Sequence, residues 1–221
     1  MEKELQKRIL SSIILLPLSF FFIIKGSAFF IIFLTILFVI ACLEWFKMTK
    51  SNEYKIFGTL FLLFSFYTVY FFRDRDLLDF LLILIICITT DIGGYIFGKI
   101  FKGPKLIKIS PNKTYAGMIG SFLLSIITSY LFAIKYDHTF LQNQNLFEDF
   151  YFIFLVFIIS SVSQIGDLTI SYFKRLSKIK NTGNIFPGHG GLLDRIDGMI
   201  FAFPFIFIIS KILLLKKKLL Y

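Results

Sequence analysis

Seven runs of apolar residues, most of them about as long as a bilayer is thick, restrict what this chain can fold into. Hydrophobic residues make up 57% of its 221 residues, and charged residues make up only 17%. This hydrophobic content exceeds what the core of a soluble protein of this size needs. Because about 17 to 25 apolar residues span a bilayer, we predict an all-α, polytopic integral membrane bundle with about seven transmembrane helices. The runs are Ile9–Ile24, Ala28–Leu43, Ile56–Phe72, Leu77–Phe97, Met118–Ile134, Phe150–Ile170 and Ile196–Leu215.

The organisation between these runs is simple. The first run follows Lys3, Lys7 and Arg8 as in a signal peptide, but no small-residue cleavage site follows it, so we predict a retained helix. No soluble domain, repeat or low-complexity linker is visible, and residues 1–221 are predicted to form a single transmembrane domain. The two cysteines lie far apart inside apolar runs, which predicts buried thiols rather than a disulfide or a zinc site.

The lysines and arginines alternate between connections. A net charge of +10 can indicate nucleic acid binding in a soluble protein, but this alternation is typical of orientation signals, so we expect no nucleic acid partner. The amino terminus and the alternate connections carry 16 cations, and the intervening connections carry four. This places the amino terminus, residues 99–113 and residues 160–198 on the cytoplasmic side. With seven spans, however, residues 216–218 (three lysines) would end outside, and the sequence leaves that conflict open.

The stretch from Ser160 to Gly198 concentrates ionisable side chains between two apolar runs. A charge at mid-membrane costs about 2.5 to 3.5 kcal/mol, so this concentration predicts a functional site. Asp194 and Asp197 stand three residues apart at the start of the predicted last helix, so both can face one way, and Asp167 lies near the end of the preceding run. Three carboxylates suit Mg²⁺. The alternative is a structural ion network with neighbouring cations.

The same stretch supplies cations and a glycine-rich segment. Glycines let a backbone approach a ligand closely, and a histidine without a second histidine or cysteine nearby favours phosphate contact over zinc. Two of the cations could equally be positive-inside anchors at the end of a helix. The candidates are Lys174 and Arg175, which are those two cations, with Gly188, His189, Gly190, Gly191 and Arg195.

A second informative stretch lies in and after the fourth run. Asp91 is an acid deep inside that run, where a bland explanation is a carboxylate satisfied by hydroxyls of neighbouring helices. The glycines that follow it predict close helix packing. Residues 110–114 (SPNKT) are predicted to form a turn before a new helix, with groups suited to phosphate and ribose oxygens, although the spacing is not that of a P-loop. The candidate substrate-binding residues are Asp91, Ser110, Asn112, Lys113 and, in the other stretch, Ser163.

Taken together, these motifs resemble one enzyme family. The run Ser163-Gln164-x-Gly166-Asp167, then Ser171 and Lys174-Arg175, then Pro187-Gly188-His189-Gly190-Gly191-x-x-Asp194-Arg195-x-Asp197 is similar to the signature of CDP-diacylglycerol synthases, also called phosphatidate cytidylyltransferases. Asp91-x-Gly93-x-Tyr95, Gly98-Lys99 and the 110–114 segment resemble the second characteristic stretch of that family. The likeness covers roughly residues 89–200. It departs from the pattern at Asn181 and Ala116, where the family usually has acids.

The resemblance implies an enzymatic activity and a role for each group of motif residues. Phosphatidic acid would attack the α-phosphorus of CTP, giving CDP-diacylglycerol and pyrophosphate. The three aspartates would hold Mg²⁺, with room for a second cation, and the cations with His189 would bind phosphate oxygens. The expected partners are CTP, phosphatidic acid and membrane lipid; the oligomeric state, including a homodimer, stays open. We expect an integral protein of a bacterial inner (cytoplasmic) membrane, with its active site facing the cytoplasm.

Three other interpretations stay open from the sequence. A relative acting on another lipid phosphate would carry the same motifs. A transporter would also keep an acid inside a span, but would not need so many phosphate-suited cations. A CDP-alcohol phosphotransferase consumes CDP-diacylglycerol, but its aspartates are spaced differently.

Overall fold

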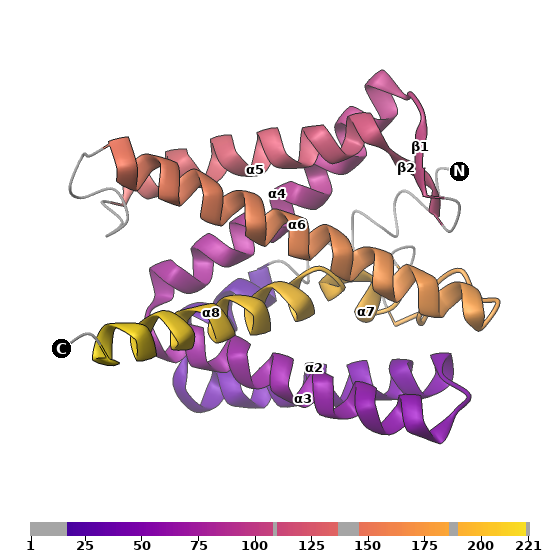
Figure 1. Ribbon diagram of the computed structural model, residues 1–221. Coiled ribbons are helices and arrows are strands. Elements are labelled where there is room, and N and C mark those ends of the chain that lie inside the picture. The colour runs from indigo at the N-terminus through magenta and orange to yellow at the C-terminus, as the bar shows by residue number, and fades with distance from the viewer. Residues whose placement is uncertain (1–16, 108–109, 137–145, 186–189, 220–221) are drawn as a thin grey trace. The chain divides into compact units, whose positions relative to one another are not determined.

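The computed structural model describes residues 17–107, 110–136, 146–185 and 190–219 and is almost entirely helical (Figure 1). Residues 17–25 form the described part of a first helix. The elements after it are α2 (Ser27–Met48), α3 (Asn52–Arg75), α4 (Leu77–Phe101), β1 (Lys105–Ile107), β2 (Ser110–Thr114), α5 (Tyr115–Lys135), α6 (Leu146–Leu176), α7 (Leu193–Ile196) and α8 (Met199–Leu219).

Five helices in the described part of the chain are long and apolar enough to cross a membrane: α2, α3, α4, α5 and residues 149–176 of α6. Residues 199–212 of α8 form a shorter apolar helix, and half of the first predicted span, residues 9–16, lies outside the described residues. The prediction of an all-α integral membrane protein is therefore confirmed. The number of seven spans stays a prediction.

Two local predictions were wrong. Ser110–Thr114 is not a turn but strand β2, which pairs antiparallel with β1 through Lys105 opposite Thr114 and Ile107 opposite Ser110. The last helix does not begin at Ile196, because α7 ends there and α8 begins at Met199. Asp197, expected near the start of one continuous helix, instead follows α7 as its C-cap residue, in the break before α8.

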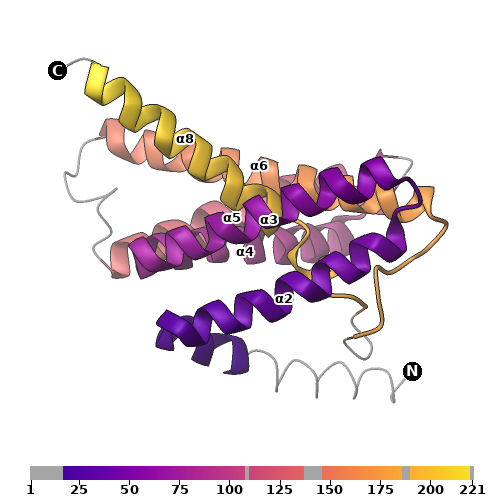
Figure 2. The same ribbon diagram turned by 90° about the horizontal axis from the view of Figure 1, so that it is seen from below.

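The chain divides into two compact units, of which the first contains residues 1–75 and 169–197. Its helices α2 and α3 lie side by side, as both views show (Figures 1 and 2). Gly58 of α3 makes room for the indole of Trp45, because a Cβ at Gly58 would stand 2.0 Å from that ring. The Trp45 Nε1–H donates to the carbonyl of Tyr54, and the indole meets the ring of Phe173 edge-on at 4.9 Å. This contact fixes the carboxyl-terminal turns of α6 against α2.

The second unit contains residues 76–168 and 198–221 and is organised by close contact between α4 and α5. A Cβ at Gly93 would stand 2.4 Å from the carbonyl oxygen of Gly120, and one at Gly117 would stand 2.7 Å from the carbonyl oxygen of Gly94. The predicted close packing of glycines is therefore confirmed. In a lipid bilayer the hydrophobic effect does not drive helices together, so their association depends on close packing. Small residues such as glycine let the two backbones approach closely enough for that packing.

Hydroxyl groups join the helices of the second unit in its interior. The Ser121 hydroxyl donates to the carbonyl oxygen of Thr90 at 2.7 Å. The Thr90 hydroxyl in turn donates to the hydroxyl of Ser160 on α6 at 2.8 Å. The hairpin is joined to the same unit through Thr114, whose side chain caps α5 by accepting from the N–H of Gly117. These bonds fix β2 relative to α4, α5 and α6.

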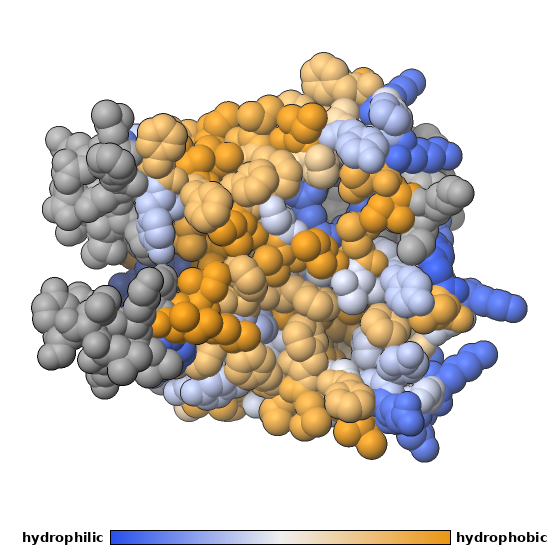
Figure 3. Space-filling view, viewed as in Figure 1, coloured by the Kyte–Doolittle hydropathy of each residue, from blue (hydrophilic) through white to orange (hydrophobic). Residues whose placement is uncertain are grey.

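Large apolar side chains remain exposed along the helices. Phe57 on α3, Leu131 on α5 and Phe150 on α6 are each more than half exposed. In Figure 3 orange apolar residues cover the middle of the face shown, and blue hydrophilic residues gather mainly toward its right-hand edge. Such surfaces fit hydrocarbon rather than water, which agrees with a membrane protein.

We predict that Gly93→Ala will destabilise the protein more than Gly98→Ala. Alanine gains about 1 kcal/mol of helix propensity at either position. At Gly93 the new Cβ would meet a backbone carbonyl at 2.4 Å, whereas at Gly98 it would meet the Thr114 hydroxyl at 3.2 Å. Overpacking against a backbone costs about 1 to 3 kcal/mol, so the Gly93 variant should unfold at a lower temperature in detergent. Equal unfolding temperatures for the two variants would contradict this packing.

Candidate active site

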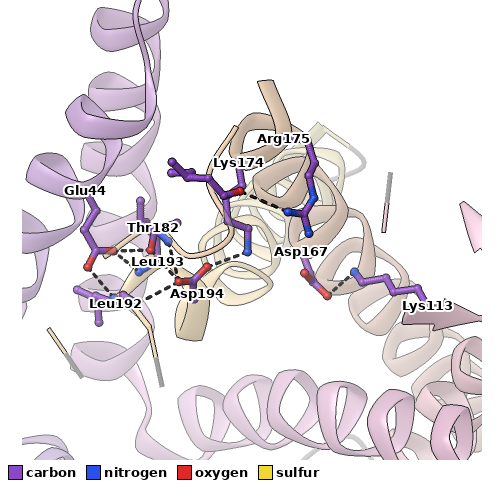
Figure 4. A network of polar contacts seen from close by, with 11 residues as sticks. Glu44, Lys113, Asp167, Lys174, Arg175, Thr182, Leu192, Leu193 and Asp194 are labelled. Carbon is purple, nitrogen blue, oxygen red and sulfur yellow. Dashed lines mark hydrogen bonds and ion pairs between the residues drawn. The ribbon is translucent and has the colours of Figure 1, made fainter. Parts of the chain in front are cut away.

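The hairpin of the second unit delivers a cation to a carboxylate on α6. Lys113 on β2 forms an ion pair with Asp167, and both side chains are about one quarter exposed (Figure 4). Lys113 is held there because β2 pairs with β1 and Thr114 begins α5. The structure thus brings together one residue from each of the two stretches that the sequence singled out.

A buried hydroxyl lies one turn before Asp167 on the same helix. Ser163 has no accessible surface, and within the described part of the chain its Oγ has no hydrogen-bond partner. It packs against Gly198, where a Cβ would stand 2.2 Å from that oxygen. An unsatisfied buried hydroxyl is uncommon and calls for a ligand or water. The Ser163 hydroxyl is therefore available to a ligand, and its predicted role in substrate binding stays a prediction.

The first unit holds a second lysine–carboxylate pair. Lys174, on the last turn of α6, donates from Nζ to Oδ1 of Asp194 at 2.7 Å. The other carboxylate oxygen accepts from the backbone N–H of Thr182 at 2.8 Å and that of Gly191 at 3.0 Å, and lies 3.1 Å from the Thr182 hydroxyl. Asp194 is therefore held in one orientation from several directions (Figure 4).

These contacts keep Asp194 ionised. Burial raises the pKa of its carboxyl group, but the hydrogen bond from Lys174, the N–H groups of Gly191 and Thr182, and the charge of Lys174 together outweigh burial. The pKa of Asp194 therefore lies below its ordinary value. At neutral pH the site presents a carboxylate and an ammonium group side by side.

A buried glutamate that the sequence analysis missed lies behind this pair. Glu44 on α2 is only 2% exposed. Its Oε1 accepts from the N–H of Leu192, and its Oε2 accepts from the N–H of Leu193 and from the Thr182 hydroxyl, all at 2.8 Å. Because Glu44 directly follows the apolar run Ala28–Leu43 and stands more than 130 residues before these partners, only its charge at the end of that run could have indicated a role.

Two glycines of the motif make this arrangement sterically possible. Gly190 has a φ of +88°, which side chains rarely adopt, and a Cβ there would stand 2.8 Å from Asp194 Oδ2. A Cβ at Gly191 would stand 2.1 Å from the Thr182 hydroxyl and 2.5 Å from Glu44 Oε2. In this structure Gly190 and Gly191 make room for carboxylates of the protein itself.

The remaining candidates fall into different places. Arg175 and Arg195 are exposed, Asp91 is exposed on α4, and Asp197 is 6% exposed at the end of α7. Ser110 is half-buried in β2. Three predicted residues cannot be placed as side chains: Gly188 and His189 lie outside the described residues, and the side chain of Asn112 is not among those described.

The metal prediction is not tested by this geometry. In the described ranges, no three His, Cys, Asp or Glu side chains form a group that could hold a metal ion. Asp167 and Asp194 instead each face a lysine. The donor chemistry still fits Mg²⁺, because aspartate and serine oxygens are hard ligands and Mg²⁺ commonly takes one or two carboxylates together with substrate phosphates.

Comparison with known proteins identifies the class. The model of the cytidylyltransferase family matches residues 63–213. The phosphatidate cytidylyltransferase of Rickettsia felis is 32% identical over 217 residues, covering 95% of this chain and 93% of the relative. That of Rickettsia bellii is 33% identical, covering 95% and 92%, and that of Staphylococcus haemolyticus is 40% identical, covering 62% and 51%. The chain belongs to the cytidylyltransferase family, and the resemblance read from its motifs is confirmed.

Proposed function

We propose that this chain transfers a cytidylyl group from CTP to phosphatidic acid, forming CDP-diacylglycerol and pyrophosphate. The predicted activity is supported by the family and by relatives that match nearly the whole chain and carry that name. The observation that carries the site is the presence of two lysine–aspartate pairs, Lys113 with Asp167 and Lys174 with Asp194, on motif residues. Both pairs belong to segments that the sequence assigned to phosphate chemistry.

The reaction asks little covalent chemistry of the protein. An oxygen of the lipid phosphate attacks the α-phosphorus of CTP, and the bond from that phosphorus to the β-phosphate oxygen breaks. The lipid phosphate is already a nucleophile, so no serine or cysteine has to be activated. The protein must align two polyanions and neutralise their charge, which is how phosphoryl-type transfer is generally catalysed.

Lys113 and Lys174 are suited to neutralising the charge of the two polyanions. In the absence of substrate, Lys113 and Lys174 are neutralised by aspartates, which spares each a buried unpaired charge. Phosphate oxygens compete for the same ammonium groups, so we propose that both lysines turn from their aspartates to the phosphates. Arg175, Arg195 and His189 are proposed to bind the remaining oxygens, since guanidinium groups match phosphate geometry.

Asp167 and Asp194, which the two lysines would release, and Asp197 are proposed ligands of Mg²⁺. Asp167, Asp194 and Asp197 supply carboxylates, and the unsatisfied Ser163 hydroxyl supplies a further oxygen of the right type. When bound, Mg²⁺ would neutralise charge that builds up on the phosphates. A second cation fits the same reasoning. The other residues that we propose to bind the substrates are Asp91, Ser110, Asn112, Gly188, Gly190 and Gly191.

The direct test is an assay of purified protein in detergent with CTP labelled at the α-phosphorus, Mg²⁺ and a panel of lipid phosphates. We expect label in CDP-diacylglycerol with one pyrophosphate per product, and turnover lower by roughly 100-fold or more in Lys174→Met and in Asp194→Asn. A matched control is Lys211→Met, a lysine outside the motifs. If the label is transferred only to a prenyl or other non-glycerol lipid phosphate, the proposed substrate is wrong. If CTP-dependent pyrophosphate release is absent, the transporter interpretation is favoured.

We also propose that the protein lies in a bacterial inner membrane with its active site toward the cytoplasm. The excess of lysine and arginine in alternate connections supports that orientation. Cysteines replacing the exposed residues Lys105 and Lys180 should react with an impermeant thiol reagent only after the cytoplasmic face is opened. A cysteine replacing Lys25 should react in intact cells. The opposite pattern would reverse the proposed orientation.

A further inference from the structure

Glu44 is a charged residue inside an apolar helix that the proposed chemistry does not use. It makes no ion pair among those described, and its 2% exposure removes it from water. A buried carboxyl group without hydrogen-bond partners is very unfavourable, and three hydrogen bonds satisfy the oxygens of Glu44. All three come from the segment that carries Asp194.

We infer that Glu44 is a positioning residue for the reaction: it fixes Thr182 and the start of α7 so that the Asp194 carboxylate faces Lys174. The link passes through two routes. The backbone N–H groups of Leu192 and Leu193, which begin α7, bind Glu44 directly. Thr182, whose hydroxyl binds Glu44, also donates its backbone N–H to Asp194. This inference rests on the proposed role of Asp194.

The hydroxyl of Thr182 shows how the two carboxylates are connected. It lies 2.8 Å from Glu44 Oε2 and 3.1 Å from Asp194 Oδ2 but carries a single hydrogen. The shorter contact assigns that hydrogen to Glu44. Asp194 then keeps its two backbone donors and Lys174, and does not depend on the hydroxyl for its charge.

The geometry predicts that glutamine cannot replace Glu44 although it has the same shape. Both carboxylate oxygens accept a backbone N–H, Oε1 from Leu192 and Oε2 from Leu193. An amide has one oxygen and one NH₂ group, so either orientation places its NH₂ against a backbone N–H. The start of α7 must then move, and Asp194 moves with it. A residue needed only for its bulk would tolerate the change.

The test compares Glu44→Gln with matched variants in the cytidylyl-transfer assay. We expect kcat to fall roughly 10- to 100-fold in Glu44→Gln, the usual loss when a supporting hydrogen bond behind a reactive group is removed. The KM for phosphatidic acid should change much less. Thr182→Val should lose turnover and Thr182→Ser should retain more of it. Thr49→Val, which removes another buried hydroxyl just after α2, is the control and should keep wild-type kinetics.

Two further measurements separate positioning from a loss of folding. Trp45, the single tryptophan, adjoins Glu44 and packs on Phe173, so unchanged fluorescence in Glu44→Gln would show that the contact between α2 and α6 persists. The double variant of Glu44→Gln with Thr182→Val should be about as slow as the worse single variant, since both act on one network. Additive losses, or an equal kcat in Glu44→Gln and wild type, would overturn the inference.

Asp194→Asn, assayed in parallel, distinguishes this failure from failure of the proposed site. If Asp194→Asn is inactive and Glu44→Gln is fully active, Glu44 has no positioning role. If Asp194→Asn retains full turnover, the proposed role of Asp194 is wrong and the inference falls with it.

Discussion

A carboxylate taken out of water has to be met by hydrogen-bond donors, and this requirement shapes the segment that carries the motif. Glu44 and Asp194 together collect the backbone N–H groups of Thr182, Gly191, Leu192 and Leu193. Without these carboxylates, the four N–H groups would have to find other partners. Hydrogen bonds to two carboxylates thereby fix Thr182 and residues 191–193, in addition to the burial of the Leu192 and Leu193 side chains.

Each lysine–aspartate pair resolves a similar problem for a site that must bind polyanions. Strong phosphate binding requires ammonium groups, yet unpaired charges near hydrocarbon are unfavourable. Pairing Lys113 with Asp167 and Lys174 with Asp194 compensates the charges of both lysines, which are the proposed phosphate-binding groups. The depressed pKa of Asp194 follows from the same contacts and keeps its carboxylate ionised at neutral pH.

Much of the site could be predicted because its chemistry is local in sequence. Asp167, Lys174 and Asp194 lie within one polar stretch between apolar runs, and the apolar runs themselves predicted the membrane helices. Glu44 could not be assigned, since its partners are backbone N–H groups that no sequence pattern marks. The hairpin was missed because Pro111 and Asn112 favour turns, whereas pairing with β1 decides the structure. The break between α7 and α8 lies at Asp197 and Gly198, which periodicity of apolar residues does not reveal.

The measurement that most directly tests this view is residue-resolved hydrogen exchange of the substrate-free protein at neutral pH. If Glu44 and Asp194 fix the segment, the amides of Thr182, Gly191, Leu192 and Leu193 should exchange roughly 100-fold or more slowly than in an unstructured peptide, because each is bonded to a carboxylate. Exchange of these four amides at the rates of an unstructured peptide would contradict the central claim that two carboxylates form the segment before substrate binds.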